Sequence, residues 1–231
     1  MEQFLADLSP WWKAFAEAWL LPGCSACGQL DGLRPSQDWW FPSFCSPCHD
    51  AWPEPAGPQP DLGLDSRLAL WAYGGSVRRL LVQAKEIPHG AQAWALAYFM
   101  REAFAQLHLP YPAVWTTPPP SRKRRWRDWY LPDFLAKQGC RAYGQEYQSL
   151  LRRRHQTKDQ GELDGSARRA NLKGNFQYLG NGGHTRSPTR VILFDDVSTT
   201  GATMVEATRA LREAGVQEVH GLSLAAVPWT G

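Results

Sequence analysis

The sequence has no apolar run long enough to cross a membrane. No stretch of its 231 residues approaches the roughly 20 uninterrupted apolar residues that a transmembrane helix needs. The first residues also lack the basic start and unbroken apolar centre of a secretory signal, because they contain Glu2, Asp7, Lys13 and Glu17. We therefore expect a cytoplasmic protein without membrane insertion, in which residues 1–21 form an amphipathic N-terminal helix.

The sequence also has little net charge and no internal repeat. Its 25 Lys and Arg residues nearly balance 22 Asp and Glu residues, and the formal net charge of +3 is too small to indicate a nucleic-acid ligand by itself. With 43% hydrophobic and 20% charged residues, the composition is that of an ordinary globular protein. Local charge is more informative, because residues 122–127 read RKRRWR.

Cysteine is scarce, yet four of the five cysteines form two CxxC pairs. Cys24 and Cys27 make the first pair, Cys45 and Cys48 make the second, and seventeen residues separate the two pairs. Two such pairs at this distance are typical of a closed tetrahedral zinc site. We predict a structural zinc ribbon over residues 22–50, which would fold a segment too short to build its own core.

Other roles for these cysteines are less consistent with the sequence than zinc binding. Cys45 to His49 also reads as CxxCH, the pattern of covalent haem attachment. That reading requires export and leaves the first pair unexplained, while disulfides and redox pairs are unusual in a cytosolic chain. Zinc is therefore preferred, and the lone Cys140 is expected to be buried.

The rest of the chain alternates between strand and helix patterns. A linker rich in proline and glycine is expected over residues 51–65, followed by one domain over residues 66–231. Strands are expected at 67–73, 113–118, 190–194 and 218–227, and helices at 76–85, 91–107, 128–138 and 201–215. This order predicts an α/β fold with a mostly parallel sheet flanked by helices.

The stretch VILFDDVSTTGAT, residues 191–203, predicts the binding site. Ligands of open α/β sheets bind beyond the carboxyl ends of the strands, where Asp195 and Asp196 are expected. The small residues that follow open a helix, whose first N–H groups and dipole favour a phosphate. Two carboxylates beside a phosphate cradle suit a phosphorylated ribose. The alternative is that the two acids merely cap a turn before the helix.

This stretch resembles the 5-phosphoribosyl-1-diphosphate (PRPP) motif of type I phosphoribosyltransferases. The resemblance implies that the 5-phosphate is held by residues 198–203, that the two acids hold the ribose hydroxyls and act in catalysis, and that Mg²⁺ accompanies the diphosphate. The PRPP-binding residues implied are Asp195, Asp196, Val197, Ser198, Thr199, Thr200, Gly201, Ala202 and Thr203.

With the four cysteines in front, nearly all of residues 20–227 resemble the ComF family of competence proteins. Residues 71–85 match its aromatic and glycine stretch leading to a lysine, and residues 150–176 match its arginine-rich segment. The resemblance implies a flexible loop that closes over the diphosphate. The residues implied for this role are Lys85, Arg127, Arg152, Arg154, Gln160, Arg169 and Asn171. The alternative is a solvated basic loop without such a role.

The sequence departs from the family over residues 117–136. The family's Gly-Phe-Asn-Gln is replaced by Asp128, Trp129, Tyr130 and Leu131. This turn is expected to lie against the diphosphate or the acceptor, so the change concerns turnover and the acceptor more than binding of the phosphorylated ribose.

Three functions remain open on the sequence. The chain is a phosphoribosyltransferase with an unknown acceptor, a regulator that binds PRPP without turnover, or an accessory protein of DNA uptake that binds single-stranded DNA and works with a helicase. The last rests on the family and on cations interleaved with aromatics. Its residues would be Arg122, Lys123, Arg124, Arg125, Trp126 and Arg127, for which a basic surface helix with inward-packing tryptophans is the alternative.

Overall fold

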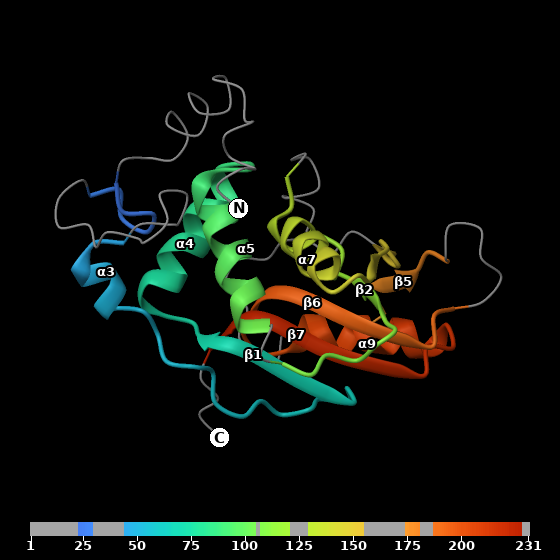
Figure 1. The fold of residues 1–231 in the computed structure, drawn as a ribbon. Helices are drawn as coiled ribbons and strands as arrows, with labels where there is room; N and C mark the ends of the chain where they lie inside the picture. The colour runs from blue at the N-terminus through green and yellow to red at the C-terminus, as the bar shows by residue number, and fades with distance from the viewer. Residues whose placement is uncertain are drawn as a thin grey trace. The chain divides into compact units, whose positions relative to one another are not determined.

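The computed structural model describes residues 23–29, 44–104, 107–120, 129–154, 174–180 and 187–227 (Figure 1). The N-terminal helix expected at 1–21 lies outside these residues. The elements are α3 (Ser46–Asp50), β1 (Ser66–Ala72), α4 (Gly75–Glu86), α5 (Ala91–Phe104), β2 (Val114–Thr116), α7 (Leu131–Ala142), β3 (Glu146–Tyr147), β4 (Leu151–Arg153), β5 (Phe176–Tyr178), β6 (Arg190–Ser198), α9 (Ala202–Glu213) and β7 (Glu218–Ala226).

Five strands form a parallel sheet in the order β1-β7-β6-β2-β3. Each neighbouring pair runs parallel, and β4 and β5 form a separate antiparallel pair. The predicted α/β class, with a mostly parallel sheet flanked by helices, is confirmed. Parallel strands need long crossover connections, which is why helices separate most of these strands in sequence.

Both faces of the central strand β6 are covered, as its apolar sequence requires. Val191 and Leu193 point to one face, where they share a core cluster with Met204 and other residues of α9. Side chains alternate along a strand, so Phe194 points to the other face, and its ring lies 6.1 Å from that of Trp115. The six-membered ring of Trp115 packs in turn on α7, which contacts β6 on this second face.

Two elements differ most in their bounds from the sequence prediction. Strand β6 was expected to end at residue 194, but it continues to Ser198, because β7 pairs with it as far as Ala226. Backbone pairing does not depend on apolar side chains, so the change to aspartate does not end the strand. Helix α7 begins at Leu131 and runs to Ala142, with a proline in its first turn, where the missing N–H has no helical partner anyway.

The chain divides into two compact units. The described residues up to Pro53 group with Gly74–Tyr98, and Glu54–Tyr73 group with the described residues from Phe99 onward. Residues 74–98, which the sequence analysis placed with the sheet, thus group with the cysteine segment, and the predicted domain boundaries stay a prediction. Among the described helices, none is both long enough and apolar enough to span a lipid bilayer.

Candidate functional site

The order of the strands creates a crevice at the carboxyl ends of β6 and β2. From β2 the chain moves outward to β3, whereas from β6 it moves the opposite way to β7. Helices that follow two such strands lie on opposite faces of the sheet, so the loops separate between the strands and leave a ligand site. Pairing of β2 with β6 stops at Thr116 and Leu193, so β6 extends beyond its neighbour on this side.

The loop between β6 and α9 forms one wall of this crevice. Gly201 has a left-handed backbone with φ of 72°, and it is the residue immediately before the first turn of α9. A Cβ at this position would lie 2.2 Å from Cδ1 of Leu62, so only glycine fits without rearrangement. Thr200 Oγ1 accepts a hydrogen bond from the N–H of Ala202 at 3.4 Å. The first N–H groups of α9 have no partners within the helix and can serve an anion.

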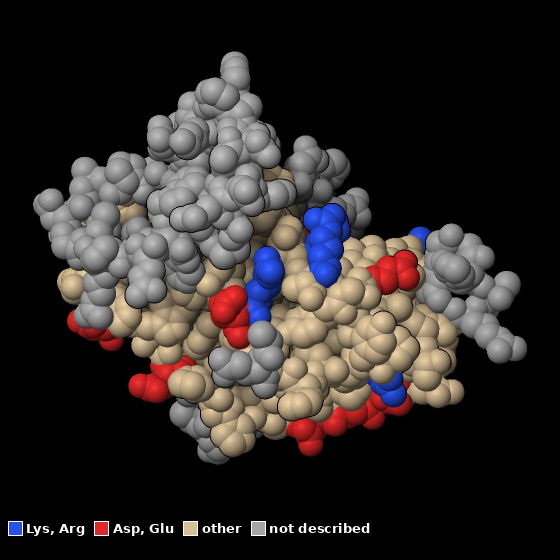
Figure 2. Space-filling model, in the orientation of Figure 1, with Lys and Arg blue, Asp and Glu red and all other residues tan. Residues whose placement is uncertain are grey.

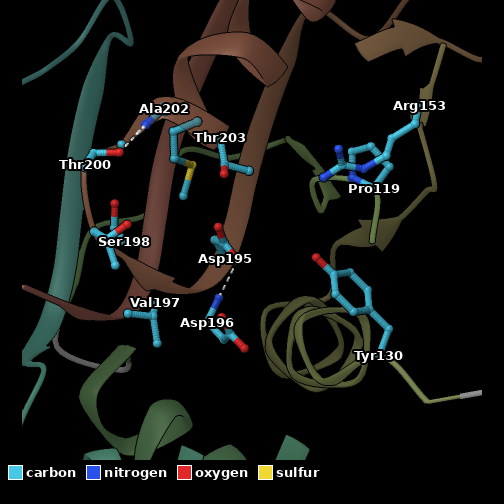
Figure 3. A pocket seen from close by; sticks show the side chains of 13 residues that line it. Pro119, Tyr130, Arg153, Asp195, Asp196, Val197, Ser198, Thr200, Ala202 and Thr203 are labelled. Atoms are coloured by element: carbon cyan, nitrogen blue, oxygen red, sulfur yellow. Dashed lines mark hydrogen bonds between the residues drawn. The ribbon is translucent and has the colours of Figure 1, made fainter. Parts of the chain in front are cut away.

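Asp195 and Asp196 lie on the second half of β6, beside this loop (Figure 3). The Oδ1 atom of Asp195 accepts the N–H of Asp196 at 2.9 Å, while Asp196 itself is buried. Strand alternation directs the two carboxylates to opposite faces of β6. The structure therefore gives the acids different surroundings, which their adjacency in sequence did not suggest.

All nine residues predicted for PRPP line one cavity of about 450 Å³. This volume is within the range of small-molecule pockets, about 300–1,000 Å³. The remaining lining residues are Pro119, Tyr130, Arg153 and Met204. The roles predicted for the nine residues stay predictions, but the chain brings them to a single concave site.

The opposite wall contains Tyr130, which belongs to the turn expected against the diphosphate or the acceptor, and Arg153, which is not among the predicted site residues. Tyr130 and Arg153 face the loop across the cavity (Figure 3). The hydroxyl of Tyr130 donates to the carbonyl of Pro118 at 3.1 Å. Nε of Arg153 donates to the carbonyl of Pro120 at 3.0 Å, and its guanidinium lies 5.1 Å from the centre of the Phe176 ring. These contacts hold a hydroxyl and a cation at the cavity.

The predicted diphosphate residues are spread over the chain. Arg152 and Arg154 flank Arg153 and are exposed, and Arg152 donates to Gln177 at 3.2 Å. Lys85 lies on α4, in the unit that contains the cysteines. Arg127, Gln160, Arg169 and Asn171 lie outside the described residues, so their part in the site stays a prediction.

The predicted nucleic-acid patch, residues 122–127, also lies outside the described residues. Trp129, two residues beyond it, is only 6% exposed, with its ring 5.2 Å from that of Phe134. This tryptophan packs inward, as the alternative for this stretch expects. On the face shown in Figure 2, the described Lys and Arg side chains lie in small separate groups with acidic side chains among them.

The four paired cysteines gather in the other unit. Their sulfur atoms all lie within 4.8 Å of one another, and the Sγ atoms of Cys27 and Cys45 are 3.7 Å apart. Tetrahedral zinc with four thiolates at about 2.3 Å places its sulfurs about 3.8 Å apart, so the cluster fits one such ion. Because both pairs take part, this arrangement favours a metal over haem attachment at Cys45 and Cys48.

Helix α4 holds the second cysteine pair from outside. Nη1 of Arg79 donates to Sγ of Cys48 at 3.2 Å, and Ser76 Oγ donates to the Cys48 carbonyl. Burial and the neighbouring thiols raise the pKa of Cys48 to about 12. A metal ion would displace this proton, since the thiolate is the ligand. Arg79 can then offset part of the negative charge of four thiolates.

Comparisons with known proteins give structural likeness alone. No family model matches this sequence, and no curated protein matches it. One similar solved structure is the allosteric regulatory enzyme of purine biosynthesis, with 20% identity and a TM-score of 0.39 over 57% of this chain and 26% of that chain. Another is adenine phosphoribosyltransferase from Leishmania tarentolae, with 14% identity and a TM-score of 0.36 over 63% of this chain and 74% of that chain.

The chain thus spans about a quarter of the length of the first of these structures, since the match covers 26% of it. At these TM-scores the likeness assigns neither a family nor an activity to this chain.

Proposed function

We propose that this chain binds a phosphorylated ribose, with PRPP and Mg²⁺ as the expected form, in the crevice between β6 and β2. The observation that supports the proposal is that the whole predicted motif, from Asp195 to Thr203, lines one cavity at the switch point of the sheet. The 5-phosphate would sit against the loop and the start of α9, where N–H groups and hydroxyls converge.

The acids and the far wall would serve the rest of the ligand. Asp195 and Asp196 would accept hydrogen bonds from the ribose hydroxyls, and Arg153 would face the diphosphate as a positive charge. Mg²⁺ prefers oxygen ligands, which these carboxylates offer, and bound with the diphosphate it would neutralise the leaving group. Tyr130 stands where the related family has a different side chain, so it would help to select the acceptor.

If the chain is an enzyme, the bond between C1 of the ribose and the diphosphate oxygen breaks, and a nucleophilic atom of the acceptor bonds to C1. Positive charge develops on the ring in the transition state, and nearby carboxylates stabilise it. A regulator would bind the same ligand without this step. The acceptor, the turnover and a cytoplasmic location belong to the proposal.

Calorimetry with ribose 5-phosphate, and with PRPP in the presence of Mg²⁺, tests binding. Asp195→Asn is expected to weaken PRPP binding by about tenfold or more, because a ligand hydroxyl loses a charged acceptor. Asp50→Asn, an exposed aspartate of α3 in the other unit, is the matched control and is expected to bind normally. If the wild-type chain binds neither ligand, the proposal is wrong.

Diphosphate release in the presence of nucleobases and amines distinguishes enzyme from regulator. An enzyme releases diphosphate with one of these acceptors, and Asp195→Asn abolishes the release. A regulator binds PRPP and Mg²⁺ but releases no diphosphate with any of them.

We also propose that the four paired cysteines bind one structural zinc ion, as in the zinc ribbon of the ComF family. The fit of their sulfurs to a tetrahedral ion supports this. The purified chain is expected to contain one zinc per molecule by elemental analysis, and Cys45→Ser to lower this content. Cys140→Ser, which changes the cysteine outside the cluster, is expected to leave it unchanged.

We propose as a second function a ComF-like role in DNA uptake, with single-stranded DNA and a helicase as partners, for which the sequence offers the basic run at 122–127 with Trp126. Cations neutralise the phosphate backbone, and aromatic rings stack on bases. Replacing Arg124, Arg125 and Arg127 by alanine is expected to lower the affinity for single-stranded DNA and to make this affinity less dependent on salt. Equal affinity in the triple variant would remove this run from consideration.

A further inference from the structure

Arg67 on β1 is a buried cation that lies against the candidate phosphate loop. It is 5% exposed, and its Nη2 atom donates to Oγ of Ser198 at 2.6 Å. The same atom lies 3.5 Å from the point where a Cβ of Gly201 would stand. The guanidinium therefore lies against the loop, but Arg67 is not among the residues that line the cavity.

The described part of the chain offers this guanidinium hydrogen-bond acceptors but no carboxylate partner. Nη1 donates to the carbonyl of Pro60 at 3.0 Å, whereas the buried Nε has no hydrogen-bond partner. Within the described part of the chain, no carboxylate forms an ion pair with Arg67.

A buried charge without an opposite charge is costly to fold. Burial lowers the pKa of the Arg67 guanidinium, but arginine stays protonated at any physiological pH. Besides the Pro60 carbonyl, the guanidinium lies against the Ser198 hydroxyl and the loop at the start of α9, both of which belong to the candidate phosphate site. The missing negative charge is thus expected on the other side of this loop.

We propose that Arg67 is a positioning residue whose counter-ion is the ligand's phosphate. This inference rests on the proposed function. Arg67 orients the Ser198 hydroxyl and the loop, and it adds a fixed positive charge behind the N–H groups of α9. In a water-poor interior this charge attracts a phosphate more strongly than it would in solvent.

Three variants and calorimetry with ribose 5-phosphate and with inorganic phosphate test the inference. Arg67→Met keeps the apolar stem and removes the charge. It is expected to weaken the binding of both ligands by about tenfold to a hundredfold, the range for hydrogen bonds to charged groups. Arg190→Met is the control. It removes an arginine from the opposite end of β6, where Glu218 is its partner, and is expected to leave both affinities unchanged.

Arg67→Lys provides a measurement that a structural role would not change. A buried lysine has a depressed pKa, so it loses its charge as the pH rises towards its ordinary range. Relative to the wild type, whose arginine remains charged, the affinity of Arg67→Lys for ribose 5-phosphate is therefore expected to fall between about pH 7 and pH 9.5.

The outcomes separate this inference from the proposed function. A wild-type chain that binds neither phosphate ligand overturns both. A wild-type chain that binds, with Arg67→Met binding equally tightly or Arg67→Lys showing the same pH profile as the wild type, overturns the inference alone. Should Arg67→Met fail to fold, the pH profile of Arg67→Lys decides.

Discussion

At the residue scale, Gly201 limits the shape of the phosphate loop. Its left-handed backbone strains any other residue, and the Leu62 Cδ1 atom, 2.2 Å from the position of a Cβ, ends a flexible side chain that would have to move. Gly201→Ala is expected to lower the free energy of unfolding by about 1–3 kcal/mol, the usual cost of such strain. Displacement of the loop is also expected to weaken the binding of ribose 5-phosphate by about tenfold or more. Urea unfolding and calorimetry measure the two effects.

Gly215, just beyond the other end of α9, gives the matched control. Its φ is also left-handed, at 93°, but a Cβ there meets nothing within 4 Å. Gly215→Ala should therefore show a similar backbone penalty in urea and unchanged ligand affinity. Equal loss of affinity in both variants would mean that general destabilisation, and not the loop, accounts for the effect.

At the scale of elements, Glu206 joins α9 to the hairpin of β4 and β5. Its Oε1 accepts the N–H of Phe176 at 3.1 Å and Nη2 of Arg209 at 2.7 Å, and Arg209 also donates to the Phe176 carbonyl. This contact holds the hairpin that presents Arg153 to the cavity. Burial opposes ionisation of Glu206, but these hydrogen bonds outweigh it and bring its pKa below the ordinary 4.5.

A carboxylate with a depressed pKa stabilises the fold above its ordinary pKa and less as the pH falls through the folded value. Glu206→Gln is therefore expected to destabilise the chain by about 1.5–3 kcal/mol near neutral pH. The difference from wild type should shrink as the pH drops below 4.5. Glu213→Gln removes the other partner of Arg209, whose side chain is 65% exposed, and should lower the free energy of unfolding by less than about 1 kcal/mol. Urea unfolding over a pH series would contradict this if the Glu206→Gln difference stayed constant.

The same scale shows what the sequence could predict. Apolar runs bounded by glycine and proline predicted most strands and helices, because the spacing of apolar residues follows which side chains are buried. The acid pair and the small loop predicted the cavity lining, because both are continuous in sequence. The choice of Arg153 over Arg152 and Arg154 depends on strand phase, which three arginines in a row conceal. Arg67 meets Ser198 only through the sheet, so no local pattern indicates their contact.

At the scale of the whole molecule, the two candidate sites belong to different compact units. The described residues of the metal cluster fall in the first unit, and all the residues that line the cavity fall in the second. Removing the metal should therefore unfold local structure around the cysteines without dismantling the phosphate loop. Free-energy changes at independent sites add to within about 0.3–0.5 kcal/mol, so loss of the metal should change the ligand affinity by no more than about twofold.

Treatment with a zinc chelator followed by hydrogen exchange and calorimetry checks this separation. Peptides covering 44–53 and 74–86 are expected to exchange faster after treatment, because α3 and α4 are tied to Cys48 by the contacts of Ser76 and Arg79. Peptides covering 191–204 are expected to keep their protection from exchange. The affinity for ribose 5-phosphate is expected to stay within about twofold of its original value. Cys45→Ser should reproduce both effects without chelator. Loss of ligand binding in the treated chain and in Cys45→Ser alike would show that the metal supports the cavity, and that the two units do not act independently.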